Sequence, residues 1–266
     1  STFDFSTLNT KIPHDKLKEV LNNIIDFAFK GGTREYIKVY NSTAYWSKTS
    51  SGRDNLYTRE QIKESLKYLI DNSFFSVGSD IFRQVIGIPM GSDLAPFFAN
   101  LFLYYYESKW LQSLKTDDYQ MARRFGNVFR YIDDLLAIND NGEFERNYKN
   151  ISPPELQLKK ENVDNDSASF LDLQLSITNK NISTQLFDKR NSYSFTIVRL
   201  PYKSSTLPSK MFFSTISAEV LRIGRATSSL PTFIETAKCL LVRMKRQGAD
   251  VLGIRNSIRK MFYGHQ

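Results

Sequence analysis

The chain has 266 residues, 41% of them apolar and 24% charged, so its composition supports a packed core and excludes global disorder. The formal net charge of +8 favours an anionic partner, and nucleic acid is the common one. A single cysteine excludes an internal disulfide, and two well-separated histidines do not predict a metal cluster. No apolar run is long enough to span a bilayer, so we expect no membrane partner.

Hydrophobic periodicity predicts a mixture of strands and helices in the first half of the chain. Helical spacing is found at residues 13–31, 58–70 and 92–111. Strand-like alternation is found at residues 2–8 and on both sides of a turn within residues 74–88. Thr58 with Gln61 predicts a capping box, and Ser92 predicts a helix cap. Residues 33–57 show no regular pattern.

The second half of the chain changes character near residue 200. Short strands are predicted at residues 127–132, 135–138, 155–160, 169–177, 184–187 and 193–200, with a short helix at 143–150. From residue 209 onward the spacing predicts three helices. Residues 201–266 carry eleven Lys and Arg against three Asp and Glu, which is the whole net charge of the chain. A solvated helical face is the ordinary explanation of such a segment, but we favour a surface for a phosphate backbone.

Carboxylates flanked by apolar residues are the first candidates for catalytic groups. The segment Tyr131-Ile132-Asp133-Asp134 places two aspartates at a tight turn between apolar strands, a pattern that alone is typical of a solvated turn. Asp4 is another acid among apolar strand residues, where a carboxylate is costly unless it has a charged partner. Paired across a sheet, such acids could hold two Mg²⁺ ions, which clamp the attacking and leaving oxygens of a phosphoryl transfer.

A second candidate is the segment at residues 87–92, where Gly87 and Gly91 bracket a rigid proline just before a predicted helix. Glycines let the backbone approach a ligand closely, and the start of a helix favours anions. A plain turn between a strand and a helix explains the same pattern, so this segment is a weak signal by itself.

In this order, the segments resemble the motifs of a reverse transcriptase palm. Residues 3–8 (FDFSTL) resemble motif A, residues 87–100 (GIPMGSDLAPFFAN) motif B and residues 129–135 (FRYIDDL) motif C. Residues 153–160 lie where motif D belongs, and residues 169–173 (SFLDL) resemble the segment near the primer grip. The combination of residues 4–8, Ile12-Pro13-His14 and residues 88–92 is most similar to the reverse transcriptase of Penelope-like retroelements.

This resemblance implies an α+β fold, with a reverse-transcriptase-type palm over residues 1–200 and a basic helical thumb over residues 201–266. The palm would consist of an antiparallel sheet and packed helices. The implied activity is that of an RNA-directed DNA polymerase, with an RNA template, a DNA primer and deoxynucleoside triphosphates as partners. Two Mg²⁺ ions, or Mn²⁺ in their place, would be the cofactors. A nuclear location is implied, because such elements copy into chromosomes.

The resemblance also implies roles for residues near the chemistry. The metal ions would be bound by the side chains of three aspartates and one backbone carbonyl, those of Asp4, Asp133, Asp134 and Phe5. Lys159 or Lys160 would protonate the pyrophosphate leaving group, although solvated charges explain both lysines equally well. The incoming nucleotide would contact Thr7, Leu8, Asn9, Met90 and Gly91.

The remaining implied contacts are those to the primer and the template. Tyr131 would contact the primer end, and Phe170 and Leu171 would help to seat it, though both could equally be core residues. Basic residues of the thumb would bind the phosphates of an A-like duplex, which is recognised by shape and backbone. The candidates are Arg222, Arg225, Arg243, Lys245 and Arg246.

Two departures from the family pattern keep alternatives open. Asn9 stands where the family usually has an aromatic residue that excludes the 2′-hydroxyl, so sugar discrimination could be loosened. The chain begins with Ser directly at motif A, so we expect a fragment or processed product that lacks the upstream fingers. One alternative is a domesticated remnant that binds nucleic acid without turnover. Another is an RNA-dependent RNA polymerase, against which the segment at 131–134 argues, because those enzymes typically have Gly-Asp-Asp.

Overall fold

The computed structural model describes residues 1–31, 34–49, 55–139, 141–164, 166–195 and 197–263. It confirms an α+β chain, and each strand pair whose register is defined is antiparallel. The chain divides into two compact units, residues 3–160 (the N-terminal unit) and residues 161–266 with residues 1–2 (the C-terminal unit). This division differs in position from the palm–thumb boundary expected at residue 200, which stays a prediction.

The central sheet of the N-terminal unit is formed by four strands that are distant in the sequence. Its order is β7 (Val128–Tyr131), β8 (Asp134–Ala137), β1 (Thr2–Phe5) and β9 (Leu158–Lys160). The expected strands at 2–8 and 155–160 are shorter than predicted, because Leu8 already begins a helix and Pro153 and Pro154 precede β9. One face of the sheet packs into the main core through Phe3, Phe5, Leu135 and Ala137.

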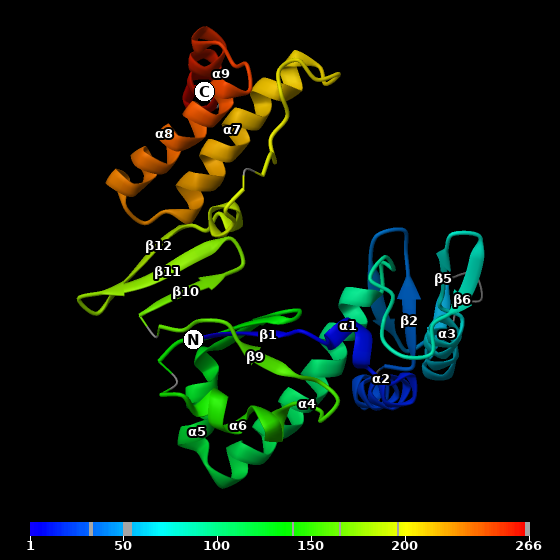
Figure 1. Ribbon diagram of the computed structural model, residues 1–266. Helices are drawn as coiled ribbons and strands as arrows, with labels where there is room; N and C mark the ends of the chain where they lie inside the picture. Colours follow the sequence, from blue (N-terminus) through cyan, green and yellow to red (C-terminus); the bar gives the residue numbers. More distant parts are fainter. Residues whose placement is uncertain (32–33, 50–54, 140, 165, 196, 264–266) are drawn as a thin grey trace. The chain divides into compact units, whose positions relative to one another are not determined.

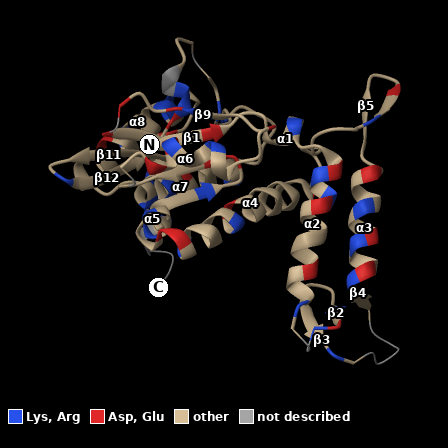
Figure 2. Cartoon of the chain, turned by 90° about the horizontal axis from the view of Figure 1, so that it is seen from below, with Lys and Arg blue, Asp and Glu red and all other residues tan. Residues whose placement is uncertain are grey.

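Helices supply the rest of that core (Figure 1). They are α1 (Leu8–Lys11), α2 (His14–Phe29), α3 (Arg59–Asp71), α4 (Ala95–Asp117), α5 (Tyr119–Arg124), η1 (Phe125–Asn127) and α6 (Glu143–Ile151). Both α2 and α3 carry acidic and basic residues (Figure 2), and the ion pairs Lys18–Asp71 (2.9 Å) and Lys63–Asp26 (2.6 Å) join the two helices. No helix in the described part of the chain combines the length and apolar composition needed to cross a bilayer.

Of the two predicted helix caps, one is confirmed and the other is wrong. Thr58 and Gln61 form the predicted capping box at the start of α3. Ser92 does not cap α4, which begins at Ala95; its hydroxyl instead accepts a hydrogen bond from the Leu94 N–H at 3.3 Å, within the preceding turn.

The segment predicted to be irregular contains strands. β2 (Tyr36–Val39), β3 (Ala44–Ser47) and β4 (Leu56–Thr58) form one sheet, in the order β3-β2-β4. Strands of three or four residues are too short to show a clear alternation, which is why the sequence pattern missed them. The predicted hairpin is confirmed as β5 (Phe74–Val77) and β6 (Asp80–Arg83), with a shorter second strand than expected.

The C-terminal unit places a sheet beside helices. β10 (Ser167–Phe170), β11 (Leu173–Thr178) and β12 (Asn181–Leu186) are followed by η2 (Lys189–Ser192) and by the predicted helices α7 (Ser209–Ala226), α8 (Leu230–Arg246) and α9 (Val251–Tyr263). The helices pack around Phe212, Ile216, Ile223 and Met244. The single strand predicted at 169–177 is wrong, because a turn divides it into β10 and β11. The strand predicted at 193–200 is also wrong, since none of its described residues is in a strand.

Candidate active site

Two of the three predicted acids, Asp4 and Asp134, lie on one face of the central sheet of the N-terminal unit, and Asp133 lies at the adjoining turn. Asp4 alternates with the buried Phe3 and Phe5 in β1, and Asp134 is followed by the buried Leu135 in β8. Since successive side chains of a strand point to opposite faces, Asp4 and Asp134 share the face that points away from the core. The N–H of Phe5 donates to the Asp133 carbonyl at 3.0 Å, which joins the two strands at this point.

The register extends this arrangement into a row across the sheet. Tyr131 of β7 lies directly opposite Asp134, and Lys159 of β9 lies directly opposite Asp4. Directly opposed residues on antiparallel strands point to the same face. The row of Tyr131, Asp134, Asp4 and Lys159 is therefore one surface, here called the carboxylate face.

The same register separates the two candidate lysines. Lys160 lies opposite Phe3, on the core side of the sheet, and its Nζ pairs with Glu145 of α6 at 2.7 Å. Lys159 is exposed and shares the carboxylate face with Asp4. Of the two lysines that the sequence could not rank, Lys159 is thus the one beside the acids.

The turn that carries Asp133 consists of Ile132 and Asp133, one residue earlier than the sequence pattern suggested. Tyr131 and Asp134 close it as a strand pair. Ile132 has φ 56°, in the left-handed region, which is costly for a β-branched residue and is found mainly at sites held by their surroundings. Among the described residues, no hydrogen bond or ion pair involves the Asp133 carboxylate.

Arg130 holds this turn in place, a role that the sequence analysis missed. Its side chain is 12% exposed and pairs with Glu107 of α4 at 2.6 Å. It also donates to the Asn100 side chain at 2.7 Å and to the Ile132 carbonyl at 3.1 Å. An arginine inside an apolar strand, two residues before a turn, is the signal that could have found it, because buried charges need partners.

The predicted nucleotide contacts lie on two segments, residues 7–9 and residues 90–91, and backbone hydrogen bonds next to them join the two segments. Leu8 is buried, while the Thr7 hydroxyl accepts a hydrogen bond from the Gln157 N–H at 3.1 Å, just before β9. The Asn9 carbonyl accepts from the Ile88 N–H at 2.8 Å. Gly91 is exposed, and the Met90 side chain is 79% exposed, a costly placement for an apolar residue.

The side chains of the three predicted acids are oxygen donors, the ligand type that Mg²⁺ takes in proteins. This ion is usually bound through one or two carboxylates together with substrate phosphates. Asp4 and Asp134 offer two carboxylates on neighbouring strands, and Asp133 adds a third at the turn. Within the described residues, no group of three or more His, Cys, Asp and Glu side chains is close enough to form a complete metal site by itself.

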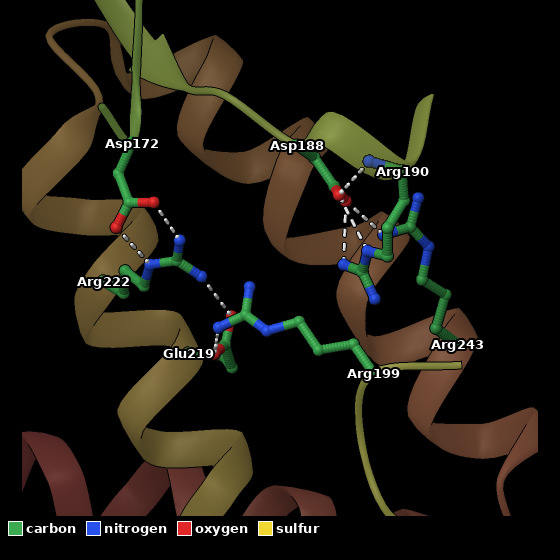
Figure 3. Close-up of polar contacts among 7 residues, drawn as sticks. All are labelled: Asp172, Asp188, Arg190, Arg199, Glu219, Arg222 and Arg243. Atoms are coloured by element: carbon green, nitrogen blue, oxygen red, sulfur yellow. Dashed lines mark hydrogen bonds and ion pairs between the residues drawn. The ribbon is translucent and has the colours of Figure 1, made fainter. Parts of the chain in front are cut away.

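The predicted primer and template contacts of the C-terminal unit divide into two groups. Figure 3 shows Arg222 bound to Asp172 at 2.6 and 3.1 Å and to Glu219 at 3.4 Å. Arg243 binds Asp188 at 2.7 Å. The exposed members of the set, Arg225, Lys245 and Arg246, have no ion pair with a described residue. Phe170 is half-buried at the end of β10, and Leu171 is exposed in the following turn, with φ 53°.

Asp188 has the most strongly shifted acidity of these groups. Its carboxylate accepts hydrogen bonds from the Arg190 backbone and side chain and from Arg243. The Arg190 guanidinium, helped by Arg243, holds the pKa of Asp188 far below its usual range, against the opposing effect of burial. Asp188 is therefore a structural anion that fixes two arginines.

No family model matches this chain, and no curated protein matches it. Among solved structures, that of apo telomerase from Candida tropicalis aligns with 98% of this chain and 44% of that one, at 12% identity and a TM-score of 0.46. Telomerase from Candida albicans in complex with the TWJ fragment of telomeric RNA aligns with 82% of this chain and 34% of that one, at 16% identity and a TM-score of 0.45. This chain spans less than half the length of either telomerase chain.

Proposed function

We propose that this chain is the catalytic part of an RNA-directed DNA polymerase, related to the reverse transcriptases of Penelope-like retroelements. The observation that carries the proposal is the carboxylate face. Three motif segments that are far apart in the sequence supply Asp4, Asp134 and Lys159 to one row, with Asp133 at the adjoining turn. A solvated turn would explain Asp133 and Asp134, but it would not explain their convergence with Asp4.

The residues of this face suit the transfer of a nucleotide to a primer 3′-hydroxyl. Bound Mg²⁺, held by Asp4, Asp133 and Asp134, would supply charge stabilisation for the phosphoryl transfer. Lys159 lies on the same face and would give a proton to the pyrophosphate as it leaves. Tyr131, at the end of the row, offers an exposed ring to the primer terminus.

The same proposal assigns the partners. An RNA template, a DNA primer and deoxynucleoside triphosphates are the substrates, and Arg225, Lys245 and Arg246 are the predicted thumb contacts that form no ion pair with a described residue. A retroelement origin would place the protein in the nucleus of a eukaryotic host. The remnant that binds nucleic acid without turnover is the competing function, supported by Asn9 and by the basic residues 201–266.

Primer extension tests the proposal. The assay uses the longest natural form of the protein that contains these residues. It is incubated with Mg²⁺ and a DNA primer annealed to an RNA template, and deoxynucleotides or ribonucleotides are supplied in separate reactions. Asp134→Asn is compared with Asp80→Asn. Asp80 is also the first residue after a two-residue hairpin turn in the same unit, but it is exposed at the start of β6. The two substitutions therefore remove the same charge from the same local position.

We expect wild type and Asp80→Asn to extend the primer equally, and Asp134→Asn to lose extension by a factor on the order of 10³. Equal activity of the two variants would contradict the assignment of the carboxylate face. If wild type binds the duplex in a salt-dependent manner but does not extend it, the polymerase proposal fails and the binding function replaces it. A preference for ribonucleotides would instead favour an RNA-synthesising enzyme.

A further inference from the structure

His14 links the two segments that carry the predicted nucleotide contacts. It is the first residue of α2, it is half-buried, and its Nε2 lies 2.8 Å from the Gly87 carbonyl oxygen. Because a carbonyl only accepts, Nε2 must carry the proton in this contact. The sequence analysis noted His14 only as part of the resemblance and gave it no role.

Backbone contacts surround this hydrogen bond on both sides. The Gly87 N–H donates to the Ile12 carbonyl at 2.8 Å, and Pro13 and Ile86 form an isolated bridge. His14 therefore closes a short ladder between residues 9–14 and residues 86–88. At Gly87, a side chain adds to these backbone contacts: His14 donates to the Gly87 carbonyl.

Gly87 is pressed against the other segment so closely that no side chain could replace its hydrogen. Its φ is 81°, and a Cβ at this position would lie 2.5 Å from the Asn9 carbonyl oxygen. One residue further on, the Ile88 N–H donates to that same carbonyl. Asn9 is thus held directly against Gly87 and Ile88, the residues that lead into Met90.

We propose that His14 is a positioning residue for nucleotide selection: by holding the Gly87 carbonyl, it fixes Asn9 and Met90 relative to each other. This inference rests on the proposed polymerase function and adds to it the residue that sets the shape of the sugar pocket. Discrimination between deoxyribose and ribose depends on a close fit at the 2′ position. A pocket whose two walls can separate binds both nucleotides less tightly and distinguishes them less well.

The test compares three variants by two independent readouts. His14→Ala removes the donor, and His14→Gln keeps an N–H donor. Asn72→Ala is the matched control, because it also removes one side-chain hydrogen bond to a backbone carbonyl, that of Tyr68 at 2.8 Å, from α3 of the same unit. The first readout is hydrogen exchange at the Gly87 and Ile88 amides. The second is KM, kcat and the preference for deoxynucleotides over ribonucleotides in primer extension.

For His14→Ala we expect faster exchange at both amides, a KM for deoxynucleotides raised about threefold to tenfold, and a sugar preference reduced by a similar factor, the worth of one lost hydrogen bond. His14→Gln should recover most of each effect, and Asn72→Ala should show none. A merely structural role would lower kcat through loss of folded protein and leave KM and the sugar preference unchanged.

Two outcomes would overturn the inference. Unchanged amide exchange in His14→Ala would show that His14 does not hold the segment. Faster exchange with an unchanged KM and sugar preference would show that the segment does not shape the pocket. If wild type does not extend primers at all, the proposed function fails, but the exchange experiment still decides whether His14 closes the ladder.

Discussion

Two hairpin turns in this chain have nearly the same local structure and opposite electrostatic surroundings. In the N-terminal unit, Ile132 and Asp133 connect β7 to β8; in the C-terminal unit, Leu171 and Asp172 connect β10 to β11. The first turn residue has φ 56° in one and 53° in the other. Each turn thus places an aliphatic residue in a strained conformation directly before an aspartate.

The surroundings of the two aspartates differ completely. Asp172 is bound in a bidentate manner by Arg222 of α7. The Asp133 carboxylate has no such partner in the described part of the chain, and its turn adjoins the row that contains Asp4 and Asp134. The comparison teaches that two turns of the same length and φ can carry an aspartate into different surroundings, and that a long-range partner makes one of them a structural anion.

The largest effect is expected from a substitution that introduces an arginine on the carboxylate face, because it removes the difference in arginine partners between the two turns. Tyr131→Arg places a guanidinium directly across from Asp134. If the proposed function holds, we expect primer extension to fall by a factor on the order of 10² or more, because a fixed cation would compete with the proposed Mg²⁺ for the acids. The free energy of unfolding should rise by about 0.5 kcal/mol from the new cross-strand pair. Tyr131→Gln is the control without charge; an equal loss in both would assign the effect to the missing ring.

Removing the structural anion Asp188 should mainly affect stability, whereas Tyr131→Arg should mainly affect primer extension. Asp188→Asn leaves Arg190 and Arg243 without their carboxylate, so we expect the free energy of unfolding of the C-terminal unit to fall by roughly 2–3 kcal/mol at pH 7. Urea unfolding followed by circular dichroism measures this loss. Asp133→Asn should change stability by less than about 0.5 kcal/mol, since no partner is lost. A large loss from Asp133→Asn would contradict the comparison.

The loss from Asp188→Asn should also depend on pH. The pKa of Asp188 is lowered in the folded chain, first by Arg190 and further by Arg243, from an ordinary value of about 3.9. A lowered folded-state pKa gives a stabilisation that is complete above the unfolded pKa and is lost as the pH falls through the folded one. Wild type and Asp188→Asn should therefore differ fully above about pH 4 and converge in stronger acid. A gap that is constant down to pH 2 would contradict this.

The pair at the second turn should be weaker. A double-mutant cycle with Asp172→Asn and Arg222→Gln should give a coupling of about 0.5–1 kcal/mol in thermal unfolding, because the Asp172 side chain is 66% exposed and solvent screens it. A coupling near zero would mean that Arg222 is held by Glu219 instead, and that Asp172 resembles Asp133 more than its contacts suggest.

The smallest expected effect concerns the strained residues themselves. Leu171→Gly should raise the free energy of unfolding by about 0.5–1 kcal/mol, because glycine adopts positive φ without strain and Leu171, 45% exposed, loses little packing. Ile132→Gly should give no net gain, since Ile132 packs against the main core. Equal gains in both would show that the turn at Ile132 is no better anchored than its counterpart.

The sequence predicts the participants of the carboxylate face better than their arrangement. Asp4 stands out because an acid amid apolar strand residues is costly, whereas Asp133 and Asp134, which alone are typical of a solvated turn, become candidates only together with it. The sequence could not show which of Lys159 and Lys160 lies beside the acids. Adjacent strand residues point to opposite faces, and which face each one takes depends on the register with β1. The roles of these residues stay predictions.

The features that the sequence missed depend on long-range partners. Arg222 and Arg243 look like free cations in a basic segment, yet their partners, Asp172 and Asp188, come from before that segment. His14 acts on a backbone carbonyl, which has no sequence signature, and the partners of Arg130 lie on a distant helix. The strand predicted at 169–177 failed because the turn residue, Leu171, is not a type that favours positive φ.

The pairing of β1 with β9 has a consequence for the order of folding during synthesis. The hydrogen bond from the Gln157 N–H to the Thr7 hydroxyl closes a loop of 150 residues, and β1 finds its partner β9 just as far away. At about 5–20 residues per second, a ribosome needs on the order of ten seconds or more to deliver the missing strand. Until then β1, which already has its neighbour β8, keeps one unpaired edge, the kind of edge that chaperones protect from aggregation.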